Sequence, residues 1–211
     1  MKIALLGAGG MIGQRILQEA LSRGHEVTAI VRDPARFTSP NPAVKVVVGD
    51  ALNVDSLSAA VAGHDVVINS TSTNRDGDPQ LYSKIAHTLL AAVKKSGVPR
   101  LIVVGGAGSL YVAPGVQAVD TPQFPAEWRP GAAALRDALE IYRTADFDWL
   151  FISPAAYIHP GERTGKYRLG GNEYMVDANG NSEISCEDYA VGLLDQAEQT
   201  APFKRHIALA Y

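Results

Sequence analysis

Apolar runs of five or six residues alternate along the chain with longer stretches in which apolar residues recur every three or four positions. A short apolar run is typical of a buried strand, and the longer spacing is typical of a helix with one buried face. The expected strands cover 2–6, 27–31, 44–48, 65–69, 100–105, 147–152 and 205–210. The expected helices cover 12–23, 54–62, 78–96, about 130–142 and a last one that begins after Ser185 as its N-cap. This alternation predicts an α/β fold: a Rossmann-type doubly wound, mostly parallel sheet with helices on both faces.

Three further expectations concern the less regular parts of the chain. The valine-rich run 44–48 is expected to be buried on both faces of the sheet. The stretch 163–176 is expected to be extended, with a hairpin around Gly170 and Gly171, and 182–184 to add a short strand. We expect one domain over 1–211, in which 108–130 and 153–184 cover the substrate.

The first apolar run leads into a glycine-rich corner and then into a helical pattern. Gly7, Gly10 and Gly13 follow the strand in a GxxGxxG spacing, with Gly9, Met11 and Ile12 between them. A strand, a glycine turn and a helix in this order predict a dinucleotide site, because glycine permits a sharp turn and close approach of a pyrophosphate to backbone N–H groups. The alternative is a tight turn without a ligand.

The end of the second strand indicates which dinucleotide is bound. A site that prefers NAD places an acidic residue there to bind the ribose hydroxyls. Arg32 stands at that position, and Arg36 follows one turn later. Two guanidiniums suit a 2′-phosphate, so the sequence favours NADP. The alternative is that both arginines are solvated and Asp33 faces the ribose.

Polar residues after the third and fourth strands complete the predicted cofactor site. Asp50 is expected to accept a hydrogen bond from adenine, with Ala51 and Leu52 along the ring, although capping of its own loop is an equal alternative for Asp50. Ser70 and Thr71 open the polar run 70–74 at the expected switch point of the sheet, where ligands of doubly wound folds bind. We expect this run to contact the phosphates or the nicotinamide ribose.

The candidate catalytic residues follow the fifth and sixth strands. Gly106 and Ser109 lie in a glycine-rich turn beside the expected nicotinamide, and Ser109 is the first candidate, its alternative role being a turn hydroxyl bonded to backbone. Tyr157 is the second candidate, whereas a lone His159 is more often structural. The irregular loop 112–129 is expected to cover the substrate, with Phe124 and Trp128 as pocket walls or loop anchors.

Composition restricts the partners. A net charge of −3 argues against nucleic acid, and the absence of an eighteen-residue apolar run argues against a membrane. The single cysteine, Cys186, has no partner for an internal disulfide, which fits a reducing compartment, so we expect the cytoplasm. Cys186 would be mildly activated by a helix end but is interpreted as structural. No residues stand at metal-ligand spacing, so no metal is expected.

The sequence lacks the Tyr-Lys pair that serves as proton donor in many dehydrogenases. Reduction of an unactivated carbonyl needs an acid, and the larger short-chain dehydrogenase group uses Tyr with Lys four residues later. None of the eight tyrosines has Lys at that offset; Tyr142 is followed there by Asp146 and Tyr157 by Gly161. Alcohol dehydrogenation by that pair is therefore disfavoured.

Several motifs together resemble a known family: GAGGMIG at 7–13, VRD at 31–33, GD at 49–50, GGAGSL at 105–110 and PGERTGKY at 160–167. They resemble the atypical short-chain dehydrogenase-like proteins, most closely the NAD(P)H-flavin reductase and biliverdin reductase B-like group, which is related to NmrA-like proteins. The resemblance covers nearly the whole chain.

The resemblance implies an NADP-bound Rossmann fold that passes hydride to flavins, biliverdin or quinones. It places Arg32 and Arg36 on the 2′-phosphate, Asp50 and Ala51 on the adenine, and Ser109 near the nicotinamide. Tyr157 stands where the biliverdin reductase branch has a His, which argues against biliverdin itself.

The leading hypothesis is therefore an NADPH-dependent reductase of a planar small molecule, with flavin as substrate rather than as a tightly bound cofactor. Hydride transfer to such a ring gives a delocalised anion that needs no strong acid, so positioning does most of the work. The alternatives are a non-catalytic NADP(H) sensor of the NmrA type and an epimerase or dehydratase. The sequence leaves a monomer and a homodimer both open.

Overall fold

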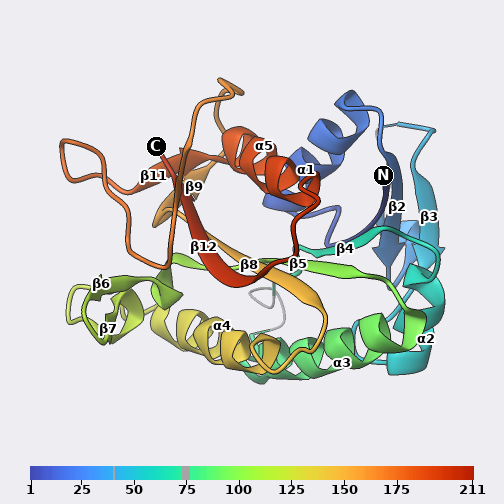
Figure 1. The fold of residues 1–211 in the computed structure, drawn as a ribbon, viewed down its shortest axis with the longest axis horizontal. Coiled ribbons are helices and arrows are strands. Elements are labelled where there is room, and N and C mark those ends of the chain that lie inside the picture. Colours follow the sequence, from blue (N-terminus) through green and yellow to red (C-terminus); the bar gives the residue numbers. More distant parts are fainter. Residues whose placement is uncertain (40, 73–76) are drawn as a thin grey trace.

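The centre of the fold is a twisted sheet of eight strands. The computed structural model of the chain describes residues 1–39, 41–72 and 77–211. Across the sheet the strands run in the order β3, β2, β1, β4, β5, β8, β12 and β10 (Figure 1). Their bounds are β1 Lys2–Leu6, β2 Glu26–Val31, β3 Lys45–Val48, β4 Val66–Asn69, β5 Arg100–Val104, β8 Asp148–Pro154, β10 Arg168–Gly170 and β12 Lys204–Ala210. Neighbouring strands are parallel except for β10, which pairs antiparallel with β12.

The strand order reverses at β1. Leu6 at the end of this strand lies opposite Ile30 of β2 on one side and Asn69 of β4 on the other. Chain segments that leave β1 and β4 therefore turn to opposite faces of the sheet. Such a reversal opens a crevice outside the carboxyl ends of the strands, where doubly wound folds bind ligands.

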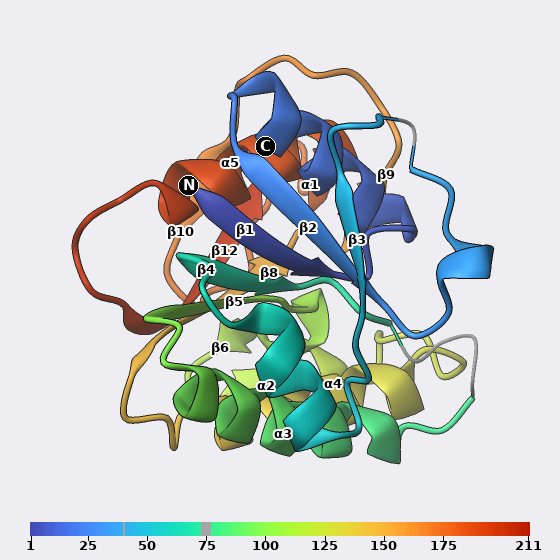
Figure 2. The same cartoon turned by 90° about the vertical axis from the view of Figure 1, so that its right-hand side faces the viewer.

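In the described residues, five α-helices cover the two faces of the sheet. On one face lie α1, Met11–Ser22, and α5, Cys186–Ala197; on the other lie α2, Val54–Val61, α3, Gln80–Ser96, and α4, Arg129–Tyr142 (Figures 1 and 2). The predicted Rossmann-type, doubly wound architecture is confirmed. The N-cap predicted for the last helix is confirmed too, because the Ser185 hydroxyl oxygen accepts the Asp188 N–H at 3.0 Å.

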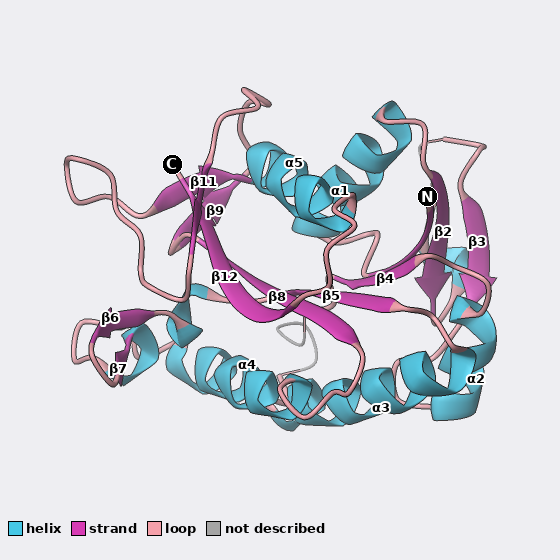
Figure 3. Cartoon of the chain, viewed as in Figure 1, coloured by secondary structure: helices cyan, strands magenta, loops and turns pink. Residues whose placement is uncertain are grey.

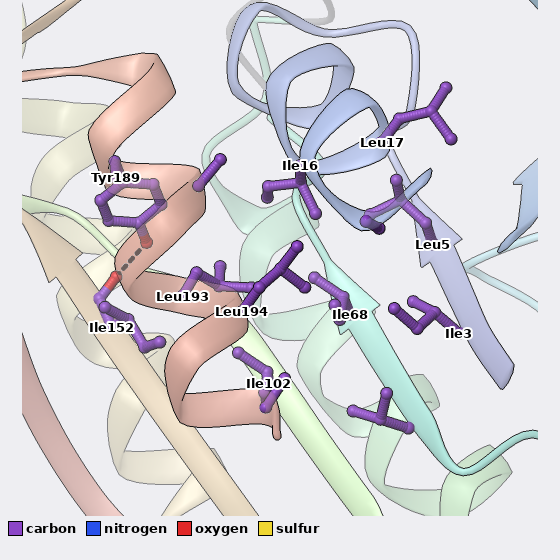
Figure 4. Packing of buried hydrophobic residues seen from close by; sticks show 14 of the residues in the cluster. Ile3, Leu5, Ile16, Leu17, Ile68, Ile102, Ile152, Tyr189, Leu193 and Leu194 are labelled. Carbon is purple, nitrogen blue, oxygen red and sulfur yellow. Dashed lines mark hydrogen bonds between the residues drawn. The ribbon is translucent and has the colours of Figure 1, made fainter. Parts of the chain in front are cut away.

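Two apolar layers hold the helices to the sheet. Under α1 and α5, Ile3, Ile16 and Leu193 are fully buried, and the Tyr189 hydroxyl donates to the Ile152 carbonyl at 2.7 Å (Figure 4). Burial of an aliphatic side chain of this size stabilises a fold by about 1.5–3 kcal/mol. The second layer, under α2, α3 and α4, is equally apolar. The strand ends that carry the site are therefore fixed from both sides.

The expectation that the third strand is buried on both faces is wrong. Val46 and Val48 of β3 are 37% and 58% exposed. The reason is the position of β3 at the edge of the sheet, beyond the helices that cover the central strands (Figure 2). Valine favours any strand and does not distinguish an edge from a centre.

The predicted hairpin around Gly170 and Gly171 is also wrong. Strand β10 instead pairs with β12, with Leu169 opposite Leu209, and the chain then crosses to form a bridge between Glu173 and Tyr111. The short strand expected at 182–184 is present as β11, Glu183–Ser185, and pairs in parallel with β9, Tyr157–His159, which the sequence pattern did not predict.

Part of the loop expected at 112–129 is regular. It contains a small hairpin of β6, Tyr111–Ala113, and β7, Val116–Gln117, which lies near the start of α4 (Figure 3). Three short 3₁₀ turns, Pro34–Arg36, Ala107–Ser109 and Ala118–Asp120, follow β2, β5 and β7.

Candidate functional site

The turn after β1 is packed tightly against the start of α1. Gly7 has φ +78°, a left-handed conformation that favours glycine, and its carbonyl accepts the Gly10 N–H at 2.9 Å. A Cβ at Gly13 would lie 2.0 Å from that same carbonyl oxygen and 2.7 Å from the Ser70 hydroxyl. Glycine is thus required at positions 7 and 13 by the close approach of β1, α1 and the end of β4.

The outer side of this turn is open. Gly9 and Met11 are exposed, and Ile12 is half-buried. Among the described residues, no side chain caps the first turn of α1, whose N-cap is Gly10. Backbone N–H groups at a helix N-terminus, with no competing cap, suit an anion such as a pyrophosphate. The glycine turn and the N-terminus of α1 therefore suit the dinucleotide that the sequence predicts.

Two arginines stand at the end of β2. Arg32 and Arg36 are both exposed, and Arg36 lies on the 3₁₀ turn Pro34–Arg36. Asp33 is the N-cap of that turn, and its carboxylate accepts the Ala35 N–H at 3.0 Å. This contact occupies one carboxylate oxygen of Asp33, which is the residue that the alternative interpretation would place on the ribose.

The residues after β3 form a self-contained turn. The Asp50 carboxylate accepts the Leu52 N–H at 2.9 Å, and the Asp50 N–H donates to the Ser56 hydroxyl at 3.2 Å. Asp50 therefore caps its own loop, which is one of the two roles that the sequence left open. This bond uses one of its two carboxylate oxygens. Ala51 is half-buried and Leu52 is 45% exposed, so Leu52 offers an apolar surface beside this turn.

The polar residues after β4 bond mainly to the protein. The Ser70 hydroxyl donates to the Leu6 carbonyl at 2.8 Å, and the Thr71 hydroxyl donates to the Asn69 side chain at 2.8 Å. These bonds fix the end of β4 against the end of β1, next to the glycine turn. Thr73 and Asn74 of the predicted polar run lie outside the described residues.

The structure turns Ser109 away from the cleft. Its side chain is only 1% exposed, and its hydroxyl donates to the Gly106 carbonyl at 2.8 Å. The same oxygen lies 3.0 Å from the Ser153 hydroxyl and 3.3 Å from the His206 Nε2. A direct catalytic role for Ser109 conflicts with this geometry, and the alternative of a turn hydroxyl fits it.

The buried group formed by Ser109, Ser153 and His206 positions the backbone of the turn. His206 Nε2 lies 2.8 Å from the Ser153 hydroxyl, and burial lowers the pKa of His206 to about 4, so its ring is neutral near pH 7. Because Ser153 and His206 come from β8 and β12, this group ties the turn after β5 to two neighbouring strands. No local sequence signal joins residues so far apart.

A large cavity adjoins this turn. Its volume is about 1050 Å³, and its lining includes the segment 105–108 after β5 and the segment 154–158, which joins the end of β8 to β9. Phe124 and Trp128 line it, in agreement with the prediction for the covering loop. Ile12, at the start of α1, also lines the cavity, so the cavity reaches the edge of the predicted dinucleotide site.

Sequence reasoning missed three of the residues that line the cavity. Pro79 and Tyr82 come from the start of α3, and Leu135 comes from α4. Their positions depend on how the helices lie across the sheet, so the local pattern carries no sign of them.

Tyr157 faces the cavity from β9. Its side chain is 62% exposed, and its ring stacks on that of His159 with centroids 4.7 Å apart. His159 bonds to the Pro160 carbonyl and, at 2.7 Å, to the Glu183 carboxylate, and these two contacts raise the pKa of His159. The histidine thus supports the tyrosine from behind, and among the described residues it does not line the cavity.

Cys186 has a structural role. It is buried at the start of α5, and burial raises the pKa of its thiol to about 11. The activation expected from the helix end is therefore wrong, because desolvation outweighs it. Over 1–39, 41–72 and 77–211, no group of three or more His, Cys, Asp or Glu residues is arranged to hold a metal ion.

Comparisons with known proteins agree on the kind of ligand. A family model described as NAD(P)H-binding matches residues 7–200. An uncharacterized protein of Bacillus subtilis, YwnB, is 39% identical over 203 residues, which cover 94% of this chain and 92% of that protein.

Two solved structures are similar over the whole chain. A protein from Streptococcus pneumoniae described as a "putative NADH-flavin reductase" has a TM-score of 0.89 and 36% identity, covering 100% of this chain and 99% of its own. A protein from Burkholderia pseudomallei described as a "putative exported protein" has a TM-score of 0.92 and 44% identity, covering 100% of both chains.

The compartment stays a prediction, since a similar structure carries the description of an exported protein. In the described part of the chain, every helix is too short or too polar to cross a membrane.

Proposed function

The chain belongs to the NAD(P)H-binding family, and on that premise we propose that it is an NADPH-dependent oxidoreductase that transfers hydride to a planar, flavin- or quinone-like acceptor. The observation that carries the proposal is the cavity of about 1050 Å³, with aromatic walls, that begins at Ile12 of the glycine turn and extends over the turn 105–108. An acceptor bound there would stack beside a nicotinamide at the ends of β5 and β8.

In this proposal the cofactor lies across the carboxyl ends of the first strands. Gly7, Gly9, Gly10, Met11, Ile12 and Gly13 hold the pyrophosphate, Asp50, Ala51 and Leu52 lie at the adenine, and Ser70, Thr71 and Gly106 border the nicotinamide half. Arg32 and Arg36 bind the 2′-phosphate. The exposure of both arginines and the engagement of Asp33 with Ala35 support NADP over NAD.

Hydride transfer to such an acceptor requires mainly that the protein position the two reacting rings. A reduced nicotinamide supplies two electrons and one hydrogen as hydride, and the acceptor anion then takes a proton. The buried group of Ser109, Ser153 and His206 keeps the turn 105–108 rigid beneath the acceptor. Tyr157, whose ring faces the cavity, is our candidate proton donor, with water as the other source.

The covering segments 108–130 and 153–184 close the acceptor in. Both contribute lining residues, Phe124 and Trp128 from the first and Tyr157 and Tyr174 from the second. Exclusion of water at this point protects the hydride from side reactions.

The test is a comparison of NADPH with NADH. The wild-type protein should bind NADPH at least about tenfold more tightly, because each charge-assisted contact to the 2′-phosphate contributes about 1.5–3 kcal/mol. Arg32→Asp should remove that preference without weakening NADH. Arg143→Asp is the matched control, since Arg143 is the C-cap residue that follows α4 and pairs with Glu140.

Turnover is measured by oxidation of NADPH with riboflavin, FMN and menadione as acceptors. An unchanged NADPH preference in Arg32→Asp refutes the phosphate clamp. If NADPH binds but none of the acceptors accelerates its oxidation, the reductase itself is refuted.

A further inference from the structure

Arg129, the first residue of α4, holds the stretch 118–128 of the covering loop. Its guanidinium donates to the carbonyls of Val119, Thr121 and Phe124 at 2.6, 3.0 and 2.9 Å. Its Cζ also lies 5.9 Å from the centroid of the Phe124 ring, within the range of a cation–π contact. One half-buried side chain therefore contacts this stretch at three points along its length.

The requirements of α4 do not explain an arginine at this position. The N-terminal end of a helix carries a partial positive charge, so a cation in the first turn is unfavourable there. The first turn of α4 contains no acidic residue, and the side chain of its N-cap, Trp128, forms no capping bond. The three loop carbonyls instead supply the acceptors that the guanidinium needs. The position of Arg129 thus serves the loop and not the helix.

The loop that Arg129 holds packs beside the turn 105–108. A Cβ added at Gly108 would lie 3.3 Å from the Val119 Cβ and 3.7 Å from the Phe124 ring, so glycine there permits a close approach. Phe124 and the turn both line the cavity. A displacement of the loop would therefore move one wall of the cavity next to the turn.

Trp128 depends on the same loop for its position. Its side chain is 60% exposed although it lines the cavity, and its backbone N–H donates to the Pro125 carbonyl at 3.1 Å. The neighbouring Arg129 N–H donates to that carbonyl too, at 3.2 Å. An exposed ring has few packing contacts of its own, so its place follows the backbone that carries it.

We propose that Arg129 is a positioning residue of the acceptor site, because its guanidinium fixes the stretch 118–128 so that Phe124 and Trp128 form a wall beside the turn 105–108. This inference rests on the proposed function, since it assigns a residue that shapes the same cavity. In the proposed site the glycine turn and Arg32 hold the cofactor. Loss of the Arg129 contacts should therefore affect the acceptor and spare NADPH.

Arg129→Lys keeps the positive charge but removes the planar fork that reaches three carbonyls at once. We expect the KM values of menadione and riboflavin to rise at least about tenfold, while kcat and the Kd of NADPH stay within about threefold of the wild type. This split is the result of lost binding in the acceptor site. Unchanged KM values for both acceptors in Arg129→Lys would overturn the inference.

Arg100→Lys is the matched control. Arg100 also donates to loop carbonyls, those of Ala197 and Ala201, at 3.0 and 3.1 Å. It begins β5, at the opposite end of that strand from the turn 105–108. This variant should lower the thermal stability and leave the KM of both acceptors unchanged. If the two variants raise KM equally, the effect belongs to general stability and the role of Arg129 in the acceptor site is overturned.

Chemical rescue tests the guanidinium itself. In Arg129→Ala, guanidinium chloride at low, non-denaturing concentration should lower the KM of menadione toward the wild-type value, and methylammonium chloride should not. Guanidinium weakens folded proteins in general, so a recovery cannot come from added stability. Equal recovery with the two cations, or none, would overturn the inference. If Arg129→Ala does not fold, the comparison of Arg129→Lys with Arg100→Lys decides.

Quenching of flavin fluorescence gives the Kd of riboflavin whether or not it is reduced, so it separates this inference from the proposed function. Riboflavin that binds the wild type without turnover, and binds Arg129→Lys more weakly, supports the inference and refutes the reductase. Turnover with the same acceptor KM in both proteins overturns the inference and leaves the reductase standing. Failure of riboflavin to bind and of menadione to be reduced overturns both.

Discussion

Alanine at position 13 tests whether the tight approach of α1 to the glycine turn sets the position of the cofactor. The added Cβ would lie 2.0 Å from the Gly7 carbonyl oxygen. Both atoms belong to packed backbone segments, so α1 and the turn must separate by about 1 Å to relieve the contact. The Gly7 carbonyl also accepts the Gly10 N–H, so the displacement reaches the turn that would hold the pyrophosphate in the proposed site.

The expected effect falls on catalysis more than on folding. Misplacement of reacting groups by about 1 Å costs about 100-fold in rate, which corresponds to about 2.7 kcal/mol in the barrier. Alanine within a helix gains about 1 kcal/mol over glycine, and this gain offsets part of an overpacking cost of about 1–3 kcal/mol. The variant should therefore fold and still lose about 100-fold in kcat/KM with NADPH and menadione.

Gly63→Ala is the control for this substitution. Gly63 has φ +79°, and a Cβ there would have nothing within 4 Å. Gly63→Ala should lower the free energy of unfolding by about 1–2 kcal/mol, because alanine disfavours the left-handed conformation, and should leave kcat/KM unchanged. Steady-state kinetics, NADPH titration and thermal unfolding by circular dichroism measure the three effects. A folded Gly13→Ala protein within about threefold of the wild type in kcat/KM would refute the reasoning.

Two further predictions concern proton transfer and stability. Tyr157→Phe should lower kcat with menadione by less than about tenfold, because water can protonate a delocalised anion. Tyr174→Phe is the control. A general acid typically contributes about 100-fold or more, and a loss of that size in Tyr157→Phe would show that the site depends on this phenol. Glu19→Gln should lower the free energy of unfolding by about 2 kcal/mol, since Glu19 is 5% exposed and its carboxylate accepts two hydrogen bonds from Arg163 and one from Arg23. Those bonds, chiefly from Arg163, hold the pKa of Glu19 below its usual 4.5. The difference in free energy of unfolding between the variant and the wild type should therefore be complete above about pH 4.5 and disappear as the pH falls through the folded-state pKa. A difference that persists at about pH 2 would contradict this prediction.

Much of the fold could be predicted because each element carries its own local pattern. Strand β1 and helix α1 were expected within a residue of their observed bounds, and the glycine turn between them at its observed position. Order across the sheet is not a local property. The valines of β3 favour a strand equally at an edge and at a centre, and for this reason their burial was misjudged.

The same distinction applies to the residues of the candidate site. Phe124 and Trp128 line the cavity as expected, because a long loop after a central strand must pass over the strand ends. The direction of the Ser109 side chain depends on Ser153 and His206, 44 and 97 residues away, so a turn sequence alone could not reveal it. A residue that looks catalytic in the sequence is buried, and the backbone it positions is the part that meets the cavity.

This arrangement is compatible with the proposed reduction at a site without a Tyr-Lys pair. The turn 105–108 lines the cavity, and the buried contacts of Ser109 with Ser153 and His206 tie it to β8 and β12; burial lowers the pKa of His206 to about 4, so its ring is neutral across the physiological range. In the proposed site, Arg32 and Arg36 would select the phosphorylated cofactor by their charge. An acceptor bound in the cavity, without a Tyr-Lys pair beside it, would be one whose reduction needs position more than acid, which is the chemistry of flavins and quinones.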